Sequence, residues 1–390
     1  MKQITRRNGL LGVLFAVTFA VVLIGCARAP SGQISSTDPF PATAHLVGMS
    51  FADQNDGIVI AEDCSTGGIG QAASACRSLP FTTSNGGQTW LAESRILLSP
   101  RAIQLVDAQN GWLIGSIGEQ CGRVSCPNAI METTDGGKSW QRAAMATSVL
   151  SDVRFVSAMN GWAVGQSCTP SNGCTGALVM TASGGQIWNN RPLPVSGQDI
   201  QLERAGTENA WAATIESGHA VIARTTDGGR TWQRLATPCQ GSTITIDFPG
   251  EDEGWLVCNA DLSEGSSANV LYQSTDGAMS WQPVGIMRLD SMAGHKTRIA
   301  AIDFISSEIG WAVDDQGHLA GSTDGGRIWT IRLNVTEPLV NVQFIGAKHG
   351  WVLGARHLWR TADGGKTWSQ VSLNDAAIDH SRPARTGEIE

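Results

Sequence analysis

Positive charge is scarce in this sequence. Lysine and arginine number 27 against 35 aspartates and glutamates, which gives a formal net charge of −8. Three of the basic residues fall within the first 25 positions, and the remaining chain carries 24 positive and 35 negative side chains, a net charge of −11. No cluster of Lys and Arg follows residue 25. This balance argues against nucleic acid as a partner and against membrane attachment through a basic patch.

Tyrosine and histidine are equally sparse. The only tyrosine is Tyr272, whereas sialidase-type chemistry needs a Tyr nucleophile with a Glu partner and an arginine cluster for the substrate carboxylate. The seven histidines are scattered, with no close pair at ligand spacing on one strand: His45, His219, His295, His318, His349, His357 and His380. We therefore expect no catalytic residues, no metal site and no cofactor.

The chain also lacks a hydrophobic run long enough to cross a membrane. Its one long apolar run, Leu10 to Ile24, has about 15 residues where a spanning helix needs about 20, and it follows basic residues as in a signal peptide. The run ends in Leu23-Ile24-Gly25-Cys26, which resembles the lipobox of bacterial lipoproteins. We expect residues 1–25 to be a lipoprotein signal peptide and Cys26 to carry a lipid. A simple transmembrane anchor and a twin-arginine signal at Arg6-Arg7 are the alternatives.

Both ends of the remaining chain are predicted to be unstructured. Residues 26–42 are rich in Ser, Pro, Thr and Ala, which suits a flexible tether, and residues 374–390 look like a disordered tail. Residues 43–373 lie between them, and they are more than one compact core usually holds. A repeat architecture is one way past that limit.

An eight-residue phrase ending in Trp recurs seven times in this region. Its copies are TSNGGQTW, TTDGGKSW, TASGGQIW, TTDGGRTW, STDGAMSW, STDGGRIW and TADGGKTW, which follow the Asp-box pattern S/T-x-D-x-G-x-S/T-W. Successive copies place their Trp residues 50, 48, 44, 49, 48 and 39 positions apart, the length of one four-stranded propeller blade. The sequence therefore predicts an all-β, seven-bladed β-propeller with four antiparallel strands in each blade.

Each Asp-box predicts a tight turn between two strands of its blade. The Gly residues supply positive φ angles, and the third side chain can accept hydrogen bonds from the turn's own amides. The Trp is expected to fold back as an apolar plug, so we interpret both positions as structural. The third positions are Asn85, Asp135, Ser183, Asp227, Asp276, Asp324 and Asp363, and the tryptophans are Trp90, Trp140, Trp188, Trp232, Trp281, Trp329 and Trp368.

A second phrase precedes each box: an apolar residue, five spacer residues and then Gly-Trp, as in Phe155 to Trp162. In blade four we take Leu202 as the apolar residue, which leaves two extra residues before Ala210-Trp211. We expect strand A of each blade to end at the apolar residue and strand B to start at Gly-Trp. Strand C then enters the box and strand D leaves it, with Trp359 and Tyr272 packed in core positions.

A polar residue stands directly before the apolar residue of every strand A. Strand A is innermost in a propeller, so these side chains are predicted to ring the central channel. The alternative is that they are buried groups that make hydrogen bonds between blades. They are Ser50, Gln104, Arg154, Gln201, Asp247, Asp303 and Gln343.

Eight cysteines remain besides Cys26, and an even number in an exported protein predicts disulfides. Each of three pairs falls within the loop between strands B and C of one blade. Cys258 is expected to end strand B of blade five, and Cys239 lies in the connection that enters this blade. The predicted bridges are Cys64–Cys76, Cys121–Cys126, Cys168–Cys174 and Cys239–Cys258. All four belong to the face opposite the Asp-box turns, which we call the loop face. Long loops on a rigid scaffold carry binding, so we expect this face to be the functional one, although disulfides also serve simply to pin long loops.

The acidic residues of the loop face leave a second interpretation open. Asp-boxes also occur in sialidases and some endoglucanases, and an inverting pair of carboxylates could lie among these loops. The alternative function is therefore a cell-surface propeller that binds or hydrolyses carbohydrate. The carboxylates concerned are Glu62, Asp63, Glu119, Glu216, Asp261, Asp314 and Asp315.

The joint pattern of Phe-x5-Gly-Trp and T-x-D-G-G-K/R-T/S-W, repeated seven times behind a lipobox, resembles the photosystem II stability and assembly factor family. The resemblance covers residues 43–373. It implies a non-catalytic, monomeric, lipid-anchored propeller that binds a membrane protein or assembly intermediate on the extracytoplasmic side of the membrane. The family's photosynthetic members use an arginine-rich surface, which this acidic chain lacks, so the identity of the client stays open.

Overall fold

A computed structural model describes residues 44–63, 77–96, 98–117, 128–169, 173–239, 241–261, 267–289, 297–373 and 376–378. These residues belong to the compact unit Pro39–Glu390. The predicted signal peptide, Cys26, the tether and two of the predicted cystines, Cys64–Cys76 and Cys121–Cys126, lie outside the described residues. The described part is all β, as predicted, and none of its segments is a helix that could span a bilayer.

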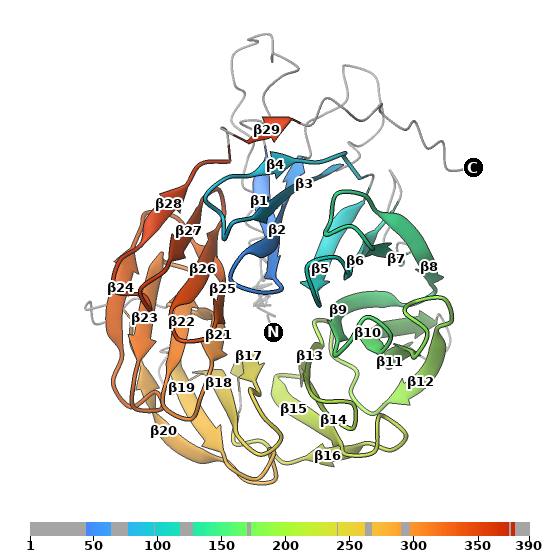
Figure 1. Ribbon diagram of the computed structural model, residues 1–390. Coiled ribbons are helices and arrows are strands. Elements are labelled where there is room, and N and C mark those ends of the chain that lie inside the picture. Colours follow the sequence, from blue (N-terminus) through green and yellow to red (C-terminus); the bar gives the residue numbers. More distant parts are fainter. Residues whose placement is uncertain are drawn as a thin grey trace, which may run out of the picture. The chain divides into compact units, whose positions relative to one another are not determined.

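Seven four-stranded antiparallel sheets stand around a common axis (Figure 1), which confirms the predicted seven-bladed propeller. The first strand of each blade is innermost, and the fourth is outermost. Blade by blade, the strands are β1 (His45–Phe51), β2 (Asp56–Asp63), β3 (Arg77–Ser84) and β4 (Leu91–Ala92); β5 (Ser99–Leu105), β6 (Gly111–Ser116), β7 (Asn128–Thr133) and β8 (Gln141–Ala146); β9 (Val149–Phe155), β10 (Gly161–Thr169), β11 (Gly173–Thr181) and β12 (Asn189–Leu193); β13 (Gln201–Ala205), β14 (Asn209–Glu216), β15 (His219–Thr225) and β16 (Gln233–Leu235); β17 (Gly241–Asp247), β18 (Gly254–Asp261), β19 (Ser267–Ser274) and β20 (Gln282–Met287); β21 (Ile299–Phe304), β22 (Gly310–Asp314), β23 (His318–Ser322) and β24 (Thr330–Asn334); β25 (Leu339–Ile345), β26 (His349–Gly354), β27 (Leu358–Thr361) and β28 (Ser369–Val371).

One short strand departs from the predicted tail. Residues Ala377–Ile378 form β29, which pairs in parallel with β4 and adds a fifth strand to blade one. The prediction of a disordered tail from residue 374 is therefore wrong at these two residues. Strand β4 is the outer strand of blade one, so its free edge can pair with an added strand. Strand β29 has only two residues, and a sequence pattern of that length cannot predict the pairing.

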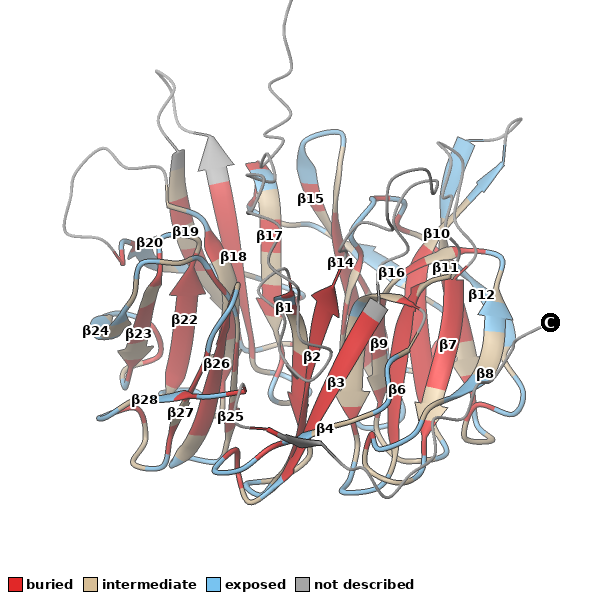
Figure 2. Ribbon diagram, turned by 90° about the horizontal axis from the view of Figure 1, so that it is seen from above, coloured by how far each residue is buried: buried red, intermediate tan, exposed pale blue. Residues whose placement is uncertain are grey.

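Burial follows the order of the strands within each blade. Figure 2 shows buried residues concentrated in the inner three strands, while outer strands such as β8 and β12 are largely exposed. Trp359 is 6% exposed and lies in the core, as expected. Because sheets pack face to face around the ring, each pair of neighbouring blades shares a hydrophobic cluster rather than contributing to one central core.

The Asp-box turns join the third and fourth strands of every blade. In blade four the Asp227 Oδ1 atom accepts the amide of Thr231 at 2.9 Å, and Thr225 Oγ1 accepts the amide of Gly229 at 3.0 Å. The two central glycines, Gly228 and Gly229, have φ angles of +70° and +77°, which L-residues rarely adopt. All seven box side chains at the third position accept an amide of their own turn in the same way.

An aromatic stack joins most neighbouring blades. The Phe that ends the inner strand of one blade lies flat on the Gly-Trp tryptophan of the preceding blade: the ring centroids of Phe248 and Trp211 are 4.0 Å apart at an interplanar angle of 5°. The edge of the same Phe contacts the box Trp281 of its own blade at 6.2 Å. Five blade junctions have such a stack. The T-shaped contact of each of these Phe rings with the box Trp of its own blade is one of the favourable aromatic arrangements.

This stack explains why glycine precedes the tryptophan. A Cβ atom on Gly254 would lie 2.1 Å from Cε1 of Phe248, and one on Gly161 would lie 2.1 Å from Cζ of Phe155. The Phe ring therefore covers the Cα of the Gly to which it is paired across the first two strands. The spacing of five residues is that of a hairpin that brings the two residues opposite each other.

Blade four shows that one predicted assignment is wrong. Its inner strand β13 continues past Leu202 to Ala205, and Arg204 pairs with Ala210 as Phe155 pairs with Gly161 in blade three. The Arg204 guanidinium lies 4.0 Å from the ring centre of Trp162 and replaces the Phe ring by a cation–π contact. There are no extra residues, and alanine is tolerated at position 210 because no aromatic ring covers it. A search for an apolar residue could not find this register.

The corrected register changes one member of the predicted ring. Glu203 pairs with Trp211 as Arg154 pairs with Trp162, so Glu203 and not Gln201 is the channel position of blade four. The residues before the Phe position also prove to bond between blades: Gln343 Oε1 accepts the amide of Phe51, and its Nε2 donates to the Phe51 carbonyl, both at 2.9 Å. Ser50, Gln104, Asp247 and Asp303 likewise accept an amide of the next inner strand.

The two remaining junctions use the side chain two residues earlier. Asp152 Oδ2 accepts the amide of Leu202 at 2.9 Å, and Gln201 Oε1 accepts the amide of Ile246 at 3.1 Å. Arg154 and Glu203 are thereby released to form an ion pair of 3.3 Å. At all seven junctions, a polar side chain of one inner strand thus accepts a hydrogen bond from the next inner strand. This agrees with the alternative prediction, in which the polar residues make hydrogen bonds between blades.

Three carboxylates come together on adjacent inner strands of blades four to six. Burial, together with the charges of Asp303 and Glu203, raises the pKa of Asp247 well above its ordinary value. Burial and the charge of Glu203 raise the pKa of Asp303 to about 7, although its bond to the Phe344 amide works in the opposite direction. Arg154 is the cation that faces this group, from blade three.

The Gly that faces each Phe gives a first test. We expect Gly254→Ala to lower the free energy of unfolding by about 1–3 kcal/mol, because the added methyl group overpacks the stack of Phe248. Gly250→Ala is the matched control, since a Cβ there would meet nothing within 4 Å. Urea unfolding measures both, and equal stabilities of the two variants would contradict the role of the ring in excluding a side chain.

The carboxylate group gives a pH-dependent test. The pKa of Asp303 is higher in the folded than in the unfolded chain, so the folded state binds more protons and stability falls as pH rises from about 4 to about 7. Asp303→Asn keeps an acceptor for the Phe344 amide and removes the charge. We expect it to raise the free energy of unfolding at pH 8 by about 1–2 kcal/mol and to leave it nearly unchanged at pH 4. Asp252→Asn, at an exposed position, makes the same charge change and should not alter the pH profile; a profile unchanged by Asp303→Asn would refute the assignment.

Candidate binding site

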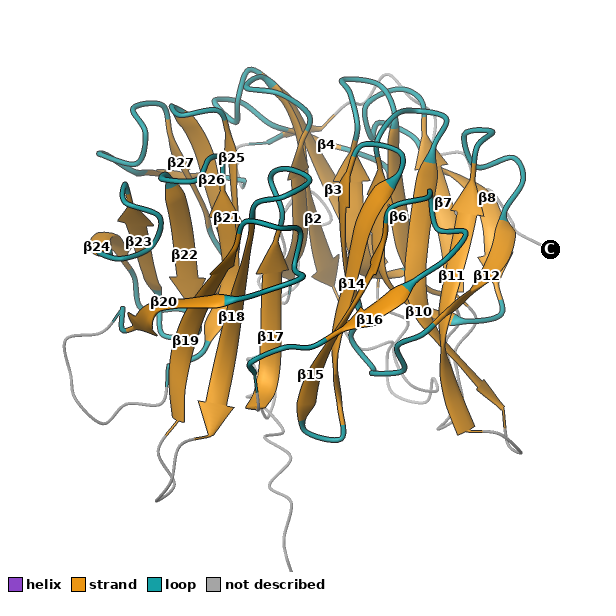
Figure 3. Ribbon diagram, turned by 90° about the horizontal axis from the view of Figure 1, so that it is seen from below, coloured by secondary structure: helices purple, strands orange, loops and turns teal. Residues whose placement is uncertain are grey.

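Strand order places the two kinds of loop at opposite ends of the blades. The turns between first and second strands bond to the Asp-box turns, as in the 2.8 Å bond from the Gly325 amide to the Glu308 carbonyl. The loops between second and third strands lie at the other end, the loop face. The hairpins β10–β11, β14–β15 and β18–β19 extend furthest there (Figure 3). Among the described strands, those of blades three to five therefore reach furthest on the loop face.

The inner strands are irregular where they reach the loop face. Five of the seven have a β-bulge four residues before the Phe position, which interrupts the pairing with the second strand. A bulge re-aims a side chain and is frequent at the rims of barrels and next to binding sites. The bulged residues are Val47, Arg101, Ser151, Ala300 and Val340. They form what we call the mouth ring of the channel.

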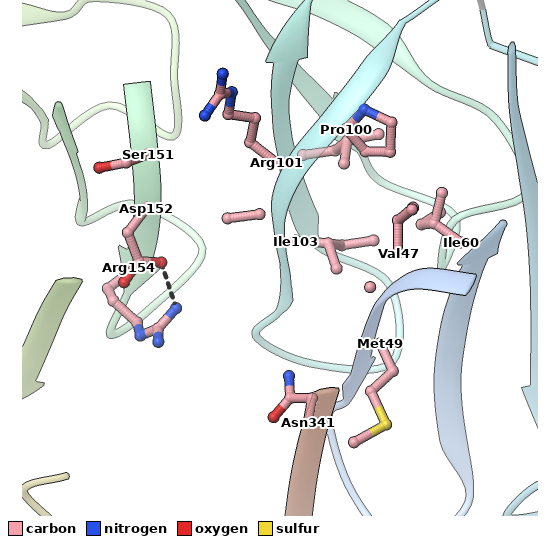
Figure 4. Close-up of a pocket in the computed structure, with 13 residues that line it drawn as sticks. Val47, Met49, Ile60, Pro100, Arg101, Ile103, Ser151, Asp152, Arg154 and Asn341 are labelled. Atoms are coloured by element: carbon pink, nitrogen blue, oxygen red, sulfur yellow. Dashed lines mark hydrogen bonds and ion pairs between the residues drawn. The ribbon is translucent and has the colours of Figure 1, made fainter. Parts of the chain in front are cut away.

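A cavity of about 210 Å³ opens among the inner strands of blades one to three and seven. Figure 4 shows Val47, Ile60 and Ile103 on one side of it, Asp152 and Arg154 on the other, and Arg101 at one edge. The remaining lining includes apolar Met49 and Leu113 and polar Asn341 and Ser151. Typical small-molecule sites measure about 300–1,000 Å³, so this volume suits one or two side chains rather than a cofactor.

Small residues at equivalent positions create the cavity. Three residues before the Phe position, blades one and two have Gly48 and Ala102, both in the lining, whereas blades three and four have Asp152 and Gln201. A Cβ on Gly48 would already lie 3.1 Å from Cγ2 of Ile103. The cavity lies beside these two small residues, on the side of blades one and two.

The two arginines of the cavity differ in their bonding. Arg154 Nη1 contacts Asp152 Oδ1 at 2.7 Å, and its Nη2 contacts Glu203 at 3.3 Å. Burial works to lower the pKa of Arg154, but these two carboxylates raise it, so the side chain stays charged and held in place. Arg101 is exposed and makes no ion pair or hydrogen bond within the part of the chain that the structure describes. It is the cation of the cavity that a ligand can neutralise.

The acidic residues of the loop face are engaged in local bonds. Glu62 pairs with His45 at 3.5 Å, Glu216 with Arg234 at 2.8 Å, and Asp314 with His318 at 2.8 Å. Burial works to raise the pKa of Glu62, but hydrogen bonds from His45 and Ser99 lower it overall. Among the residues described, no three His, Cys, Asp or Glu side chains are grouped so that they could hold a metal ion. Glu119 and the side chain of Asp261 lie outside the described set.

Two disulfides connect elements near the loop face. Cys168–Cys174 ties β10 to β11 next to their hairpin turn, at a Cα–Cα distance of 4.0 Å. Cys239–Cys258 joins the connection that enters blade five to strand β18, at a Cα–Cα distance of 5.7 Å. Cys258 lies within β18 rather than at its end. Both Cys239 and Cys258 are buried in the hydrophobic cluster between blades four and five. Such bridges are typical of extracytoplasmic proteins.

The cavity brings together residues that the sequence did not single out. Of the predicted channel ring, only Arg154 lines it. Arg101, Val47 and Asp152 were missed, because the expected pattern considered one polar residue per strand and did not include a bulge. One sequence feature could have identified Arg101. It is the only charged residue of the mouth ring, whose other members are valine, serine and alanine.

Comparisons with known proteins agree with this architecture. Residues 143–282 match the family model described as photosynthesis system II assembly factor YCF48. No curated protein sequence matches the chain. A solved structure of YCF48 from Cyanidioschyzon merolae is 18% identical, with a TM-score of 0.58 over 84% of this chain and 98% of that one. A structure described as YCF48 bound to D1 peptide is 17% identical, with a TM-score of 0.57 over 83% of this chain and 94% of that one.

Propeller-containing hydrolases share the fold as well. An ancestral GH74 enzyme is 10% identical, with a TM-score of 0.56, and this chain covers 47% of its length. At such identities the likeness shows the fold alone. The sequence match to residues 143–282 goes further, and it confirms the resemblance that the repeats predict: this seven-bladed propeller is similar in sequence and in fold to the photosystem II assembly factor YCF48 family.

Proposed function

We propose that this chain is a non-catalytic, lipid-anchored assembly factor that holds an extended segment of a membrane protein at the mouth of its channel. The observation that carries the proposal is the cavity beside the mouth ring, which is sized for side chains and lined by the mouth-ring residues Val47, Arg101 and Ser151. The structure described as YCF48 bound to D1 peptide supports it, because that protein, a propeller of similar fold, is described as binding a peptide.

The position at which the chain enters the propeller supports a membrane client. Ala44 lies on the loop face, where its carbonyl accepts a 2.8 Å hydrogen bond from Arg356 Nη1 in the β26–β27 turn of blade seven. The predicted tether, residues 26–42, would join a lipid on Cys26 to the propeller at this face. The mouth would then face the bilayer from which a client segment emerges, on the extracytoplasmic side.

The bonding of the loop-face carboxylates weakens the carbohydrate alternative. An inverting glycosidase needs two carboxyl groups about 6.5–9.5 Å apart across an open site. Glu62, Glu216 and Asp314 instead make local contacts with His45, Arg234 and His318, respectively. We infer that these side chains hold the loop face in shape, and that the propeller acts as a monomer that binds protein.

Photo-crosslinking from two faces tests the proposal. A benzoyl-phenylalanine at Val340, which is 42% exposed in the mouth ring, should crosslink the full-length protein in its own membranes to one membrane protein, identified by mass spectrometry. The control is the same residue at Ile328, which is 69% exposed in the Asp-box turn of blade six at the opposite end. Crosslinks of equal yield from both positions, or none from the mouth, would overturn the proposal, and glycan binding with hydrolysis of a polysaccharide would favour the alternative.

A further inference from the structure

We propose that the cavity takes one apolar side chain of the client segment together with a neighbouring carboxylate group, which pairs with Arg101. This inference rests on the proposed function, because it names the chemistry that the mouth recognises. The carboxylate can belong to an Asp or Glu side chain or to a chain terminus, and both sources present the same group to the guanidinium.

The apolar half of the site comes from the first two blades. Val47, Ile60 and Ile103 face the cavity from β1, β2 and β5, and Met49 and Leu113 complete this wall. Ile60 and Leu113 are fully buried, so the wall is packed from behind and cannot collapse into the space.

The charged half depends on Arg101. Its neighbour in the cavity, Arg154, is already neutralised by Asp152 and Glu203, whereas Arg101 has no such partner among the described residues. An arginine pairs with a carboxylate through two parallel hydrogen bonds, which gives direction as well as energy. The bulge at β5 places Arg101 at the edge of the cavity, beside the apolar wall.

Other charges of the channel favour one orientation of the ligand. Asp152 lines the opposite wall, and Glu203, Asp247 and Asp303 follow on blades four to six. The cation on that side, Arg154, is already paired with Asp152 and Glu203, so a ligand carboxylate is attracted to Arg101, over the blades whose inner ring residues are the uncharged Ser50, Gln104 and Gln343. The asymmetry of charge and the asymmetry of the cavity therefore point to the same side of the channel.

Methyl NMR spectroscopy with short probe peptides tests this inference. The mature protein, labelled at isoleucine methyl groups, is titrated with N-acetyl-Ala-Leu carrying a free carboxylate, with its C-terminal amide, and with N-acetyl-Asp-Leu-amide. We expect the Ile60 and Ile103 signals to shift with both carboxylate peptides and the uncharged amide to bind at least fivefold more weakly. The ratio of the affinities of the two carboxylate peptides shows whether a terminal or a side-chain carboxylate is the better ligand.

Three variants make the result specific. Arg101→Gln should remove the preference for a carboxylate and keep the weak binding of the amide, whereas Ala102→Leu should fill the cavity and abolish all shifts. Arg142→Gln, an exposed arginine on the outer strand β8, is the matched control and should behave like the unchanged protein. Urea unfolding of the same samples shows whether the variants are folded.

Two outcomes would overturn the inference: equal binding of the acid and the amide, or a carboxylate preference that survives Arg101→Gln. Either outcome leaves the proposed function standing if crosslinks still form from Val340. Loss of those crosslinks would instead remove the proposed function itself, so the two failures can be told apart.

Discussion

The contact between the inner strands of neighbouring blades is the interaction on which the rest of this structure depends. A Phe ring lies on the tryptophan of the preceding blade, a Gly makes room for that ring, and a polar side chain accepts an amide of the next inner strand. Repeated around the axis, this seam fixes where each inner strand begins and ends. The bulges, the mouth ring and the cavity all take their positions from it.

Differences among the seven inter-blade contacts explain why the two sides of the channel have different side chains. In blade four Arg204 replaces the Phe and Ala210 the Gly, and the inter-blade hydrogen bonds of the adjoining junctions move two residues along the strand. That move frees Arg154 and Glu203 to pair with each other across the channel wall. Blades one and two keep small residues at the shifted position, and the cavity opens there.

Much of the fold was predictable because the Asp-box and Gly-Trp phrases are dictated by local geometry. A turn with two positive φ angles favours glycine, although Ala278 takes one of these positions in blade five, and a residue covered by an aromatic ring requires it, so their spacing gives the number of blades and the order of strands. The register of blade four could not be predicted from apolar residues, because Arg204 replaces the Phe and makes a cation–π contact in place of the aromatic stack. The cavity and β29 depend on bulges and on an exposed strand edge, which leave little trace in a single sequence.

A protein that only holds a client needs a rigid mouth more than it needs reactive groups. Here the closed ring supplies rigidity, and the two described disulfides add cross-links near the loop face. The acidic surface sets this chain apart from a platform that attracts its client by positive charge. Selectivity would then rest on a shaped apolar space beside a single available arginine.

Native-state hydrogen exchange of the inner-strand amides tests the central claim of ring closure most directly. If the seam couples all seven blades, the amides of Phe51, Leu105, Phe155, Phe304 and Phe344 will exchange through one common opening whose free energy equals that of global unfolding. Separate openings of different free energy, blade by blade, would contradict a ring that is held as a unit by its inter-blade contacts.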